Sequence, residues 1–420
     1  MITDVIVIGA GAAGMAAAIK AKEEGASVLL VEREDIKGGI LNQCIHNGFG
    51  LSVFKEELTG PEYAGRYQEM MAETDIAVMT GMTVTDIMKD NGLFDVVATG
   101  ETHGLVHLSA RAVVMSTGCY ERTRGAIRIP GDRPKGIMPA GSAQRYLNID
   151  GYLVGERVFI LGSGDIGLIM ARRMTLEGAK VLGVAEIMPH SNGLTRNIVQ
   201  CLDDFDIPLY LSHTVTNIEG KDVLEAVTIS QVDAGFNPVP GTEKRFEVDT
   251  LLLSVGLVPD VQLFEGLPVD LSKKTGSATV DQTLETTVSG LYVCGNALHV
   301  HDLVDFVSLE AEQAGFHAAR HAQGKTEQAQ AVLDVIPGKL VHHTVPSRIL
   351  PGKTSGQVSL AFRTTRKASV ARFILSQNGR VIKDQTARHV APAEMASVTF
   401  DLDALDPEGD IVLDMEVRAS

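Results

Sequence analysis

Two glycine-rich turns constrain this chain more than any other feature. The first turn reads Gly9-Ala10-Gly11-Ala12-Ala13-Gly14, and the second reads Gly162-Ser163-Gly164-Asp165-Ile166-Gly167. Each turn follows a short apolar run, precedes a stretch of helix-forming residues, and is followed by a second apolar run. This order predicts a strand–turn–helix–strand unit, and the chain contains two copies of it.

The glycine spacing points to phosphate binding. In a Gly-x-Gly-x-x-Gly turn the first glycine permits the tight bend, the second lets the backbone approach a pyrophosphate, and the third allows close helix–strand packing. The following helix directs its N-terminus at the phosphate charge. An acidic residue roughly 20 positions later accepts from the ribose hydroxyls, and Glu32 and Glu186 stand at those places. We therefore predict two dinucleotide sites; the alternative for either turn is a Rossmann-like domain without a nucleotide.

Glu186 also bears on cofactor choice. A carboxylate at this position repels a 2′-phosphate, so we expect NAD(H) to be preferred over NADP(H). Arg172 and Arg173 lie nearby in sequence. Helix periodicity places them at least a turn away from the phosphate end, and we interpret them as surface arginines.

Composition limits the class of protein. A chain of 420 residues with 45% hydrophobic residues is long enough for two or three domains. Its net charge of −16 argues against nucleic acid and anionic membrane surfaces as partners. Residues 2–8 are interpreted as a buried strand rather than a signal peptide, and no apolar run approaches the ~20 residues of a membrane span. Four scattered cysteines without CxxC or zinc spacing suit a cytoplasmic protein.

The last part of the chain has a different pattern. From Lys339 onward, polar and apolar residues alternate in short runs, and Asn378-Gly379 is a strong hairpin signal. We predict a small antiparallel β domain over 335–420, without a catalytic constellation. It is a candidate interface for a homo-oligomer.

Three further segments carry a family resemblance: Ser116-Thr117-Gly118, Ser254-Val255-Gly256 and Gly290-Leu291-Tyr292-Val293-Cys294-Gly295-Asn296. With the two glycine turns, they resemble the flavoproteins with two dinucleotide-binding domains, which include thioredoxin reductase-like and NADH oxidase-like enzymes. The resemblance covers about residues 1–325. It implies an α/β fold in which an NAD(P)H-binding domain, 121–256, is inserted into an FAD-binding domain formed by 1–120 and 257–325.

A narrower resemblance rests on residues 38–50, 163–173 and 299–307. They are similar to bacterial FAD/NAD(P)-binding subunits that occur beside a glycerol-3-phosphate dehydrogenase-like flavoprotein. Related subunits belong to opine oxidase, hydrogen cyanide synthase and dye-linked proline dehydrogenase. The larger relatives have an iron–sulfur region with clustered cysteines, which this sequence lacks.

The resemblance implies the following cofactor contacts. FAD is expected at Gly9, Gly11, Ala12, Ala13, Gly14, Glu32, Arg33, Gly39, Ile40, Leu41, Val84, Thr117, Gly118, Gly295, Asn296 and Val304. NAD(H) is expected at Gly162, Gly164, Asp165, Ile166, Gly167, Glu186 and Gly256. The family usually has Asp where this chain has Asn296, and an amide there can still hydrogen-bond the ribityl chain or phosphate.

Cys44 and His46 are the candidate catalytic residues. Dithiol–disulfide exchange needs a second cysteine, and none stands near Cys44 or as CxxC in the NAD domain. Cys44 either forms a flavin adduct or a sulfenic acid, or is a small packing residue beside the flavin. His46 either relays a proton or binds an anion, or is hydrogen-bonded within its loop.

The segment after Asn296 offers further candidates. His299 and His301 form a His-x-His pair, but no third ligand stands at a suitable spacing, so we expect no metal. A helix beginning near residue 303 is expected to direct its N-terminus at the flavin, as the resemblance implies. Asp302 is then a candidate N-cap, with Asp305 in the first turn.

These features favour an FAD-dependent oxidoreductase that moves hydride between NAD(P)H and FAD and exchanges electrons with a partner subunit or a small acceptor. One alternative is the electron-accepting subunit of a glycerol-3-phosphate or amino-acid dehydrogenase complex. Another is an NADH oxidase or peroxidase that uses Cys44. A third, from another class, is an assembly subunit in which FAD is only a structural element.

Overall fold

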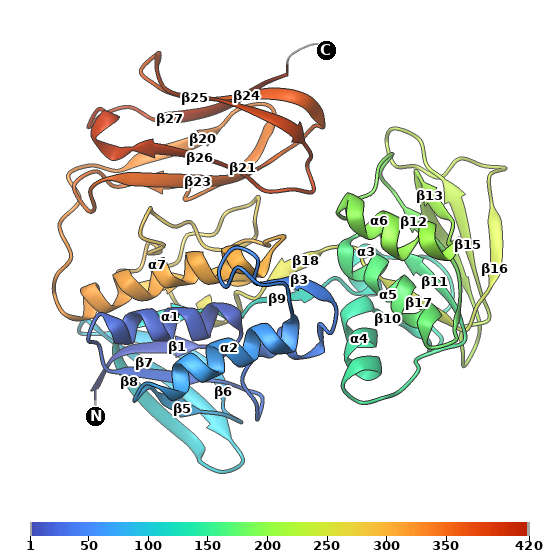
Figure 1. Ribbon diagram of the computed structural model, residues 1–420, viewed down its shortest axis with the longest axis horizontal. Coiled ribbons are helices and arrows are strands. Elements are labelled where there is room, and N and C mark those ends of the chain that lie inside the picture. Colours follow the sequence, from blue (N-terminus) through green and yellow to red (C-terminus); the bar gives the residue numbers. More distant parts are fainter. Residues whose placement is uncertain (1, 418–420) are drawn as a thin grey trace. The chain divides into compact units, whose positions relative to one another are not determined.

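The protein consists of two compact units. The computed structural model describes residues 2–417. Unit 2 is Tyr120–Val258, and unit 1 combines Met1–Cys119 with Pro259–Ser420, so unit 2 is inserted into unit 1 (Figure 1). The chain passes between the units through two short strands that pair with each other, β9 (Cys119–Glu121) and β18 (Leu257–Pro259).

A seven-stranded sheet forms the centre of unit 1. Its main path runs β5-β2-β1-β8-β7-β6, and the carboxyl half of β8 pairs in parallel with β19. Strands β1, β2, β5, β8 and β19 are parallel, whereas β6, β7 and the first half of β8 form an antiparallel meander. The strands are β1 (Ile2–Ile8), β2 (Val28–Val31), β5 (Ala77–Met79), β6 (Thr83–Asp90), β7 (Leu93–Gly100), β8 (Gly104–Met115) and β19 (Leu291–Val293).

Three helices complete this layer: α1 (Ala12–Glu23), α2 (Gly60–Ala72) and α7 (Val304–Ala322). Helix α1 is alanine-rich and lies beside α7 (Figure 1). A Cβ atom added at Gly315 of α7 would lie 2.2 Å from the Ala17 carbonyl oxygen, so glycine permits this close approach. Shorter elements of the same unit are the 3₁₀ turns η1 (Gly39–Gln43), η3 (Gln262–Phe264) and η4 (Gly295–Ala297), and strands β3 (Asn47–Phe49) and β4 (Leu58–Thr59).

Unit 2 repeats the same principle on a smaller scale. Its parallel sheet has the order β10-β17-β11-β12-β13, and a separate antiparallel sheet has the order β14-β15-β16. The strands are β10 (Ile137–Pro139), β11 (Arg157–Leu161), β12 (Lys180–Glu186), β13 (Leu209–Leu211), β14 (His213–Glu219), β15 (Ala226–Gln231), β16 (Lys244–Glu247) and β17 (Thr250–Leu253). The helices are α3 (Arg124–Ile127), α4 (Ala140–Asn148), α5 (Asp165–Leu176), α6 (Thr195–Cys201) and η2 (Asp203–Phe205).

The C-terminal strands form two sheets within unit 1. One sheet has the order β22-β20-β27-β24-β25, and the other has the order β21-β23-β26. The pairs are antiparallel, as predicted, except that β20 pairs in parallel with β27. Their shared core includes the fully buried Phe362 and Phe373. The elements are β20 (Leu333–Pro337), β21 (Val341–Val345), β22 (Arg348–Ile349), β23 (Gln357–Thr364), β24 (Ala368–Gln377), β25 (Arg380–Val390), β26 (Ala396–Asp401), η5 (Leu402–Ala404) and β27 (Ile411–Val417).

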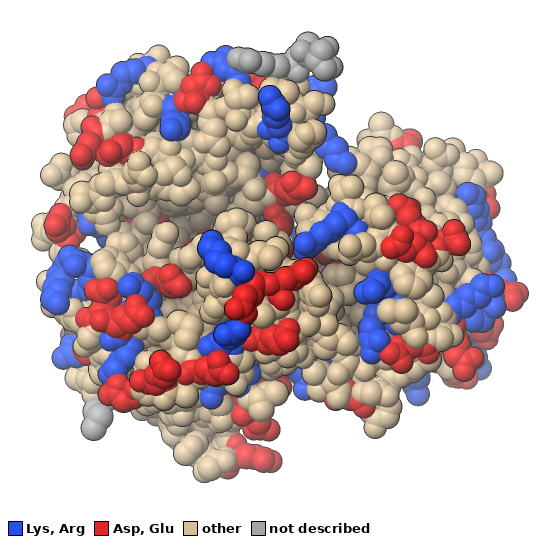
Figure 2. All heavy atoms as spheres, in the orientation of Figure 1, with Lys and Arg blue, Asp and Glu red and all other residues tan. Residues whose placement is uncertain are grey.

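The surface carries both signs of charge. On the face drawn in Figure 2, lysine and arginine side chains stand among aspartates and glutamates. Within residues 2–417, no helix combines the length and apolar character that a membrane crossing requires.

Candidate dinucleotide sites and their surroundings

The first glycine turn connects β1 to α1. Gly9 has a φ of +98°, and Ser116 Oγ at the end of β8 donates to the carbonyl oxygens of Ile8 (2.7 Å) and Gly9 (3.0 Å). A Cβ atom at Gly14 would lie 1.7 Å from the Gly9 carbonyl oxygen, whereas one at Gly11 would meet no atom within 4 Å. No side chain caps α1, and its first turn contains no acidic residue. The uncapped N–H groups and the open space at Gly11 fit a bound pyrophosphate.

Loops that are distant in sequence meet at this turn. Gly38 N donates to the Ala10 carbonyl at 2.8 Å, and a Cβ atom at Gly39 would lie 3.2 Å from Gly11 Cα. Leu41 of the same segment is buried, while Ile40 is exposed. The structure therefore brings the predicted 39–41 segment against the first glycine turn.

The two acidic residues have matching environments. Glu32 accepts from the backbone N–H of Ala10 (2.6 Å) and Glu34 (2.8 Å). Glu186 accepts from Ser163 N (3.0 Å) and Oγ (2.6 Å), and from the N–H of Met188 (2.9 Å). Both carboxylates are buried and hold the second residue of their glycine turn. Because a carboxylate has about four acceptor positions, each keeps capacity for a ribose hydroxyl.

The second glycine turn repeats the first in unit 2. Gly162 also has a φ of +98°, α5 has no side-chain cap, and Ser254 Oγ accepts from Gly167 N at 3.1 Å. One feature is specific to this copy: Asp165 Oδ1 accepts from Leu194 N (2.8 Å) and Asn197 Nδ2 (2.6 Å). Asp165 thus ties the 190–197 segment to the turn, a contact that the sequence did not predict.

The remaining predicted residues vary in position. Arg33 is exposed, Val84 is half-buried on β6, and Gly256 lies in unit 2, where its carbonyl accepts from Arg122 N at 3.1 Å. Ile166 is half-buried in the first turn of α5. Arg172 is exposed and Arg173 pairs with Glu177.

Two further segments approach the first site from the centre of the sheet. Thr117 Oγ1 donates to the Asp260 carbonyl at 3.0 Å, and Asp260 N donates to the Gly118 carbonyl at 3.0 Å. Asn296, in the turn η4 that follows β19, is half-buried. Its side chain accepts from His301 N at 3.0 Å and its amide lies 3.7 Å from Cys119 Sγ. Sequence reasoning did not single out Cys119 as a neighbour of this turn.

Helix α7 begins at Val304, which is half-buried, and Leu303 occupies the N-cap position without a side-chain hydrogen bond. The prediction that Asp302 caps this helix is wrong. Asp302 instead accepts from the Arg363 guanidinium and from Met395 N (2.7 Å), both of which belong to the C-terminal strands and their loops. Asp305 lies in the first turn as predicted, but its carboxylate is buried and accepts from the N–H groups of residues 50, 52 and 53.

Cys44 and His46 stand in the loop between η1 and β3. Cys44 is buried, and burial raises the pKa of its thiol to about 12. The thiol is therefore protonated at neutral pH, which is unfavourable for a nucleophile. His46 is half-buried, with Nδ1 3.1 Å from the Asn47 carbonyl and its ring stacked at a tilt against Phe49.

His299, His301 and Glu310 form a cluster that the sequence analysis did not predict. Glu310 Oε2 lies 2.7 Å from His299 Nε2, and Oε1 lies 3.2 Å from His301 Nε2. Burial opposes ionisation of Glu310, but the two imidazoles hold its pKa well below the usual range. Glu310 Oε1 also accepts from Gly295 N at 2.7 Å. The expectation of no metal rested on the lack of a third ligand, and that premise is wrong because α7 brings Glu310 to the pair.

The model of the family described as pyridine nucleotide-disulphide oxidoreductase matches residues 3–333. The chain belongs to this family. It has the predicted α/β fold of two dinucleotide-binding domains, and its homologues in this family are FAD-dependent NAD(P)H oxidoreductases.

The proteins that this chain is similar to carry the names of several different enzymes. Sarcosine oxidase subunit alpha of Corynebacterium sp. (strain U-96) is 27% identical over 318 residues, which cover 70% of this chain but only 31% of that protein. Ferredoxin–NADP reductase of Lactococcus lactis subsp. cremoris (strain MG1363) is 24% identical over 76% of this chain and 92% of the reductase. Thioredoxin reductase of T. acidophilum superposes with a TM-score of 0.61 at 27% identity, over 77% of this chain and 98% of that one. The chain thus spans about a third of the length of the sarcosine oxidase subunits it matches.

Proposed function

We propose that this protein transfers hydride between NAD(P)H bound at Gly162–Gly167 and FAD bound at Gly9–Gly14, without a dithiol. The observation that carries the proposal is the repeated geometry of the two turns. Each combines a left-handed first glycine, an uncapped helix and a buried glutamate that fixes the turn. Two turns of this kind in one chain support electron transfer between two nucleotides better than a role in assembly alone.

The chain's own residues act by binding and orientation. N–H groups at the starts of α1 and α5 receive the two pyrophosphates, and Glu32 and Glu186 hold the turns and accept from ribose hydroxyls. Thr117, Gly118, Gly295 and Asn296 line the FAD side, and the uncapped first turn of α7 adds partial positive charge there. FAD, when bound, supplies a two-electron carrier for hydride. Catalysis then depends on positioning rather than on a side-chain acid or base.

We further propose that NADH is preferred over NADPH. Glu186 is buried at the end of β12 and is already bonded to the Ser163 turn, so its place is fixed. A 2′-phosphate beside this carboxylate would meet a negative charge that cannot easily move away.

The cysteines support chemistry without disulfide exchange. None of the four cysteines, which all lie among the described residues, is joined in a disulfide, and burial raises the pKa of Cys44, Cys201 and Cys294. The same burial makes a peroxidase mechanism through Cys44 less favourable, because attack requires the thiolate. Thioredoxin reductases are among the relatives, so the absence of disulfide reduction is a claim to test directly.

A second candidate function is that of an electron-carrying subunit. Relatives named as subunits include sarcosine oxidase subunit alpha and hydrogen cyanide synthase subunit HcnB of Pseudomonas protegens, the latter 23% identical over 286 residues. In this version, a partner flavoprotein oxidises glycerol 3-phosphate or an amino acid and this chain passes the electrons to NAD⁺ or another acceptor. Co-purification of a partner flavoprotein with a tagged copy of this chain would support the subunit function. Full activity of the isolated chain with a small acceptor would argue against the subunit function.

Anaerobic stopped-flow absorbance tests the main proposal. We expect NADH to bleach the flavin absorbance band in a single turnover and NADPH to bleach it more slowly. We expect thioredoxin or a small disulfide, added afterwards, to leave the reduced protein unoxidised. Failure of both nucleotides to bleach the flavin would refute hydride transfer. Stoichiometric disulfide reduction would refute the claim that no dithiol is involved.

A further inference from the structure

We propose that His299, His301 and Glu310 form a binding site for a divalent transition-metal ion of the Zn²⁺ or Fe²⁺ type, with one face open to a cavity. The site is distinct from both glycine turns. The three side chains each offer one ligand atom, and these atoms lie within 4.8 Å of one another. Two imidazoles and a carboxylate are a ligand set used both for open zinc sites and for non-haem iron.

The geometry suits an ion after a small adjustment. Metal–ligand distances of about 2.0–2.2 Å in a tetrahedral arrangement place neighbouring ligand atoms about 3.3 Å apart. The Glu310 oxygens lie 2.7 Å and 3.2 Å from the two Nε2 atoms. Both of these distances therefore lie within an ångström of the spacing that a bound ion requires. The ligands come from the segment after η4, where His299 is buried, and from the second turn of α7.

Unpaired buried nitrogens provide an independent observation. Among the described residues, His299 Nδ1 and His343 Nε2 are buried without a hydrogen-bond partner, and their rings lie 6.4 Å apart between centroids. Buried polar atoms in native proteins almost always have partners, and an orphaned pair in one place points to a missing ion or water. A metal on His299 Nε2 would fix Nδ1 as the protonated nitrogen, and the unpaired Nε2 of His343 on β21 belongs to a neighbouring ring.

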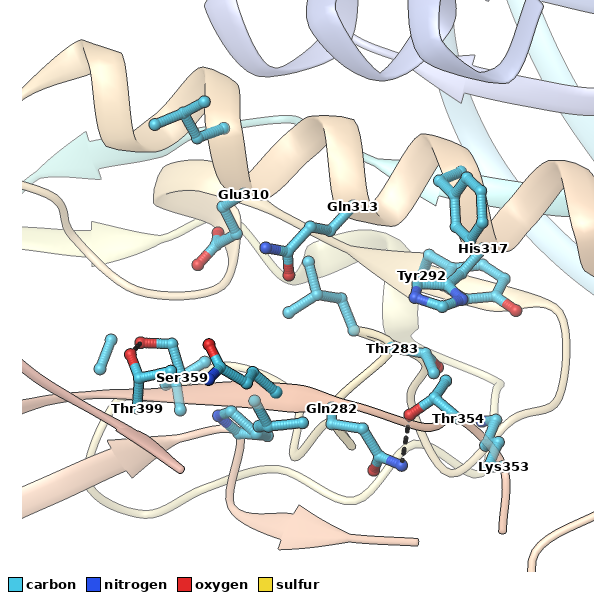
Figure 3. A pocket seen from close by; sticks show the side chains of 18 of the residues that line it. Gln282, Thr283, Tyr292, Glu310, Gln313, His317, Lys353, Thr354, Ser359 and Thr399 are labelled. Atoms are coloured by element: carbon cyan, nitrogen blue, oxygen red, sulfur yellow. Dashed lines mark hydrogen bonds between the residues drawn. The ribbon is translucent and has the colours of Figure 1, made fainter. Parts of the chain in front are cut away.

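The cavity gives the ion access to small molecules. A cavity of about 750 Å³ lies between α7 and the C-terminal strands, and His301 and Glu310 are part of its wall. Figure 3 shows Glu310 and Gln313 pointing from α7 into this space, with Ser359 of β23 and Thr399 of β26 across from Glu310. An ion held by three protein ligands keeps a coordination position for water or for an oxygen-bearing ligand on the cavity side.

The site also touches the proposed FAD region. Glu310 Oε1 accepts from Gly295 N, and His301 N donates to Asn296. A bound ion would therefore fix both residues of this turn as well as the cavity wall. The metal site itself does not depend on the proposed function, because its ligands are defined by their own geometry.

Titration with metal alone tests the site. The 420-residue protein is stripped with a chelator and titrated calorimetrically with Zn²⁺, and in a second arm anaerobically with Fe²⁺. We expect one ion per chain, and His301→Gln and Glu310→Gln to weaken binding by more than the roughly 10–100-fold that loss of an outer hydrogen-bonding partner of a ligand costs. His107→Gln, an exposed histidine on β8 in the same unit, is the matched control and should bind as the wild type does.

X-ray absorption of the loaded wild-type protein removes the dependence on variant folding. Two imidazole nitrogens and a carboxylate oxygen at about 2.0–2.2 Å would support the site. The proposal is overturned if the wild type takes up neither ion, if both variants bind as tightly as His107→Gln while retaining a native circular dichroism spectrum, or if the absorption data show no imidazole ligands. None of these results depends on hydride transfer, so this proposal and the proposed function can fail separately.

Discussion

Lys353 connects the C-terminal strands to the sheet that holds the first glycine turn, and its replacement by methionine should destabilise unit 1. Its ammonium contacts both Asp281 and Glu285 in the loop before β19. The lysine side chain is 10% exposed, and the two carboxylates are 1% and 8% exposed. Lys353→Met keeps most of the apolar stem and leaves two buried acidic groups without their cation.

The expected loss of stability depends on the hydrogen bonds that the two carboxylates keep in the variant. Removing one partner of a buried ion pair costs about 3–5 kcal/mol. Here Asp281 keeps Thr283 N and Oγ1 at 2.7 and 2.6 Å, and Glu285 keeps Gly290 N at 2.5 Å. These donors compensate part of the lost charge, so we expect a loss near the lower end, about 3 kcal/mol at pH 7.

The pH dependence identifies the cause. In the wild type, burial opposes ionisation of Glu285, but Lys353 and the Gly290 N–H lower its pKa overall. This contribution to stability is present above the unfolded pKa of about 4.3 and is lost as pH falls through the folded pKa. In Lys353→Met the lysine charge is gone, so burial raises the pKa of Glu285. As pH falls, protonation of Glu285 then removes the buried charge that destabilises the variant. The difference between the two proteins should therefore shrink from pH 7 to pH 4.

Urea unfolding at several pH values, combined with hydrogen exchange of the 281–291 segment, measures this effect. Lys383→Met, at an exposed position on β25, is the matched control and should change stability by less than about 0.5 kcal/mol. A destabilisation equal to that of the control, or one that does not vary with pH, would refute the electrostatic reasoning.

Three shorter predictions test other parts of the structure. Gly14→Val should abolish FAD retention because its side chain overlaps the Gly9 carbonyl, whereas Gly167→Val should leave FAD bound and slow reduction by NADH by at least about 10²-fold; loss of FAD from both variants would contradict separate sites. Cys44 should resist iodoacetamide in the native protein at pH 8, because a pKa of about 12 leaves a thiolate fraction of only ~10⁻⁴; peptide mapping that finds rapid native modification would contradict this. Arg363→Met should cost about 1.5–3 kcal/mol, because it removes charged hydrogen bonds to Asp302 and the Val300 carbonyl; hydrogen exchange should increase at residues 299–303, and unchanged exchange would refute the link.

The sequence predicted those features that short segments determine. The two glycine turns, their helices and their glutamates each lie within about 25 residues, so turn chemistry and periodicity are sufficient. The Asn378-Gly379 hairpin is likewise local, and the structure has both residues at positive φ. The function of both glutamates as anchors for their own turns was not predicted, because the motif describes what they offer to a ligand and not what they accept from the backbone.

Contacts between distant segments were not predictable in the same way. Asp302 looked like an N-cap because it precedes a helix, but Arg363, 61 residues later, takes its carboxylate. The helical repeat could have indicated Glu310, because it lies in the second turn of α7, the helix that begins just after His301. Glu310 reaches the two histidines because helix α7 carries it there, and not because it is their neighbour in sequence.

The C-terminal strands therefore have a larger role than their sequence indicates. They contain no dinucleotide-binding glycine turn. Arg363 nevertheless fixes the carbonyl of Val300 and the carboxylate of Asp302, directly beside His299 and His301. The Lys353 ion pair fixes the loop on the other side of β19. Because both links act on segments that flank Gly295 and Asn296, loosening the strands should disturb the FAD region and the histidine cluster together. A C-terminal region that only mediated assembly would leave both unchanged.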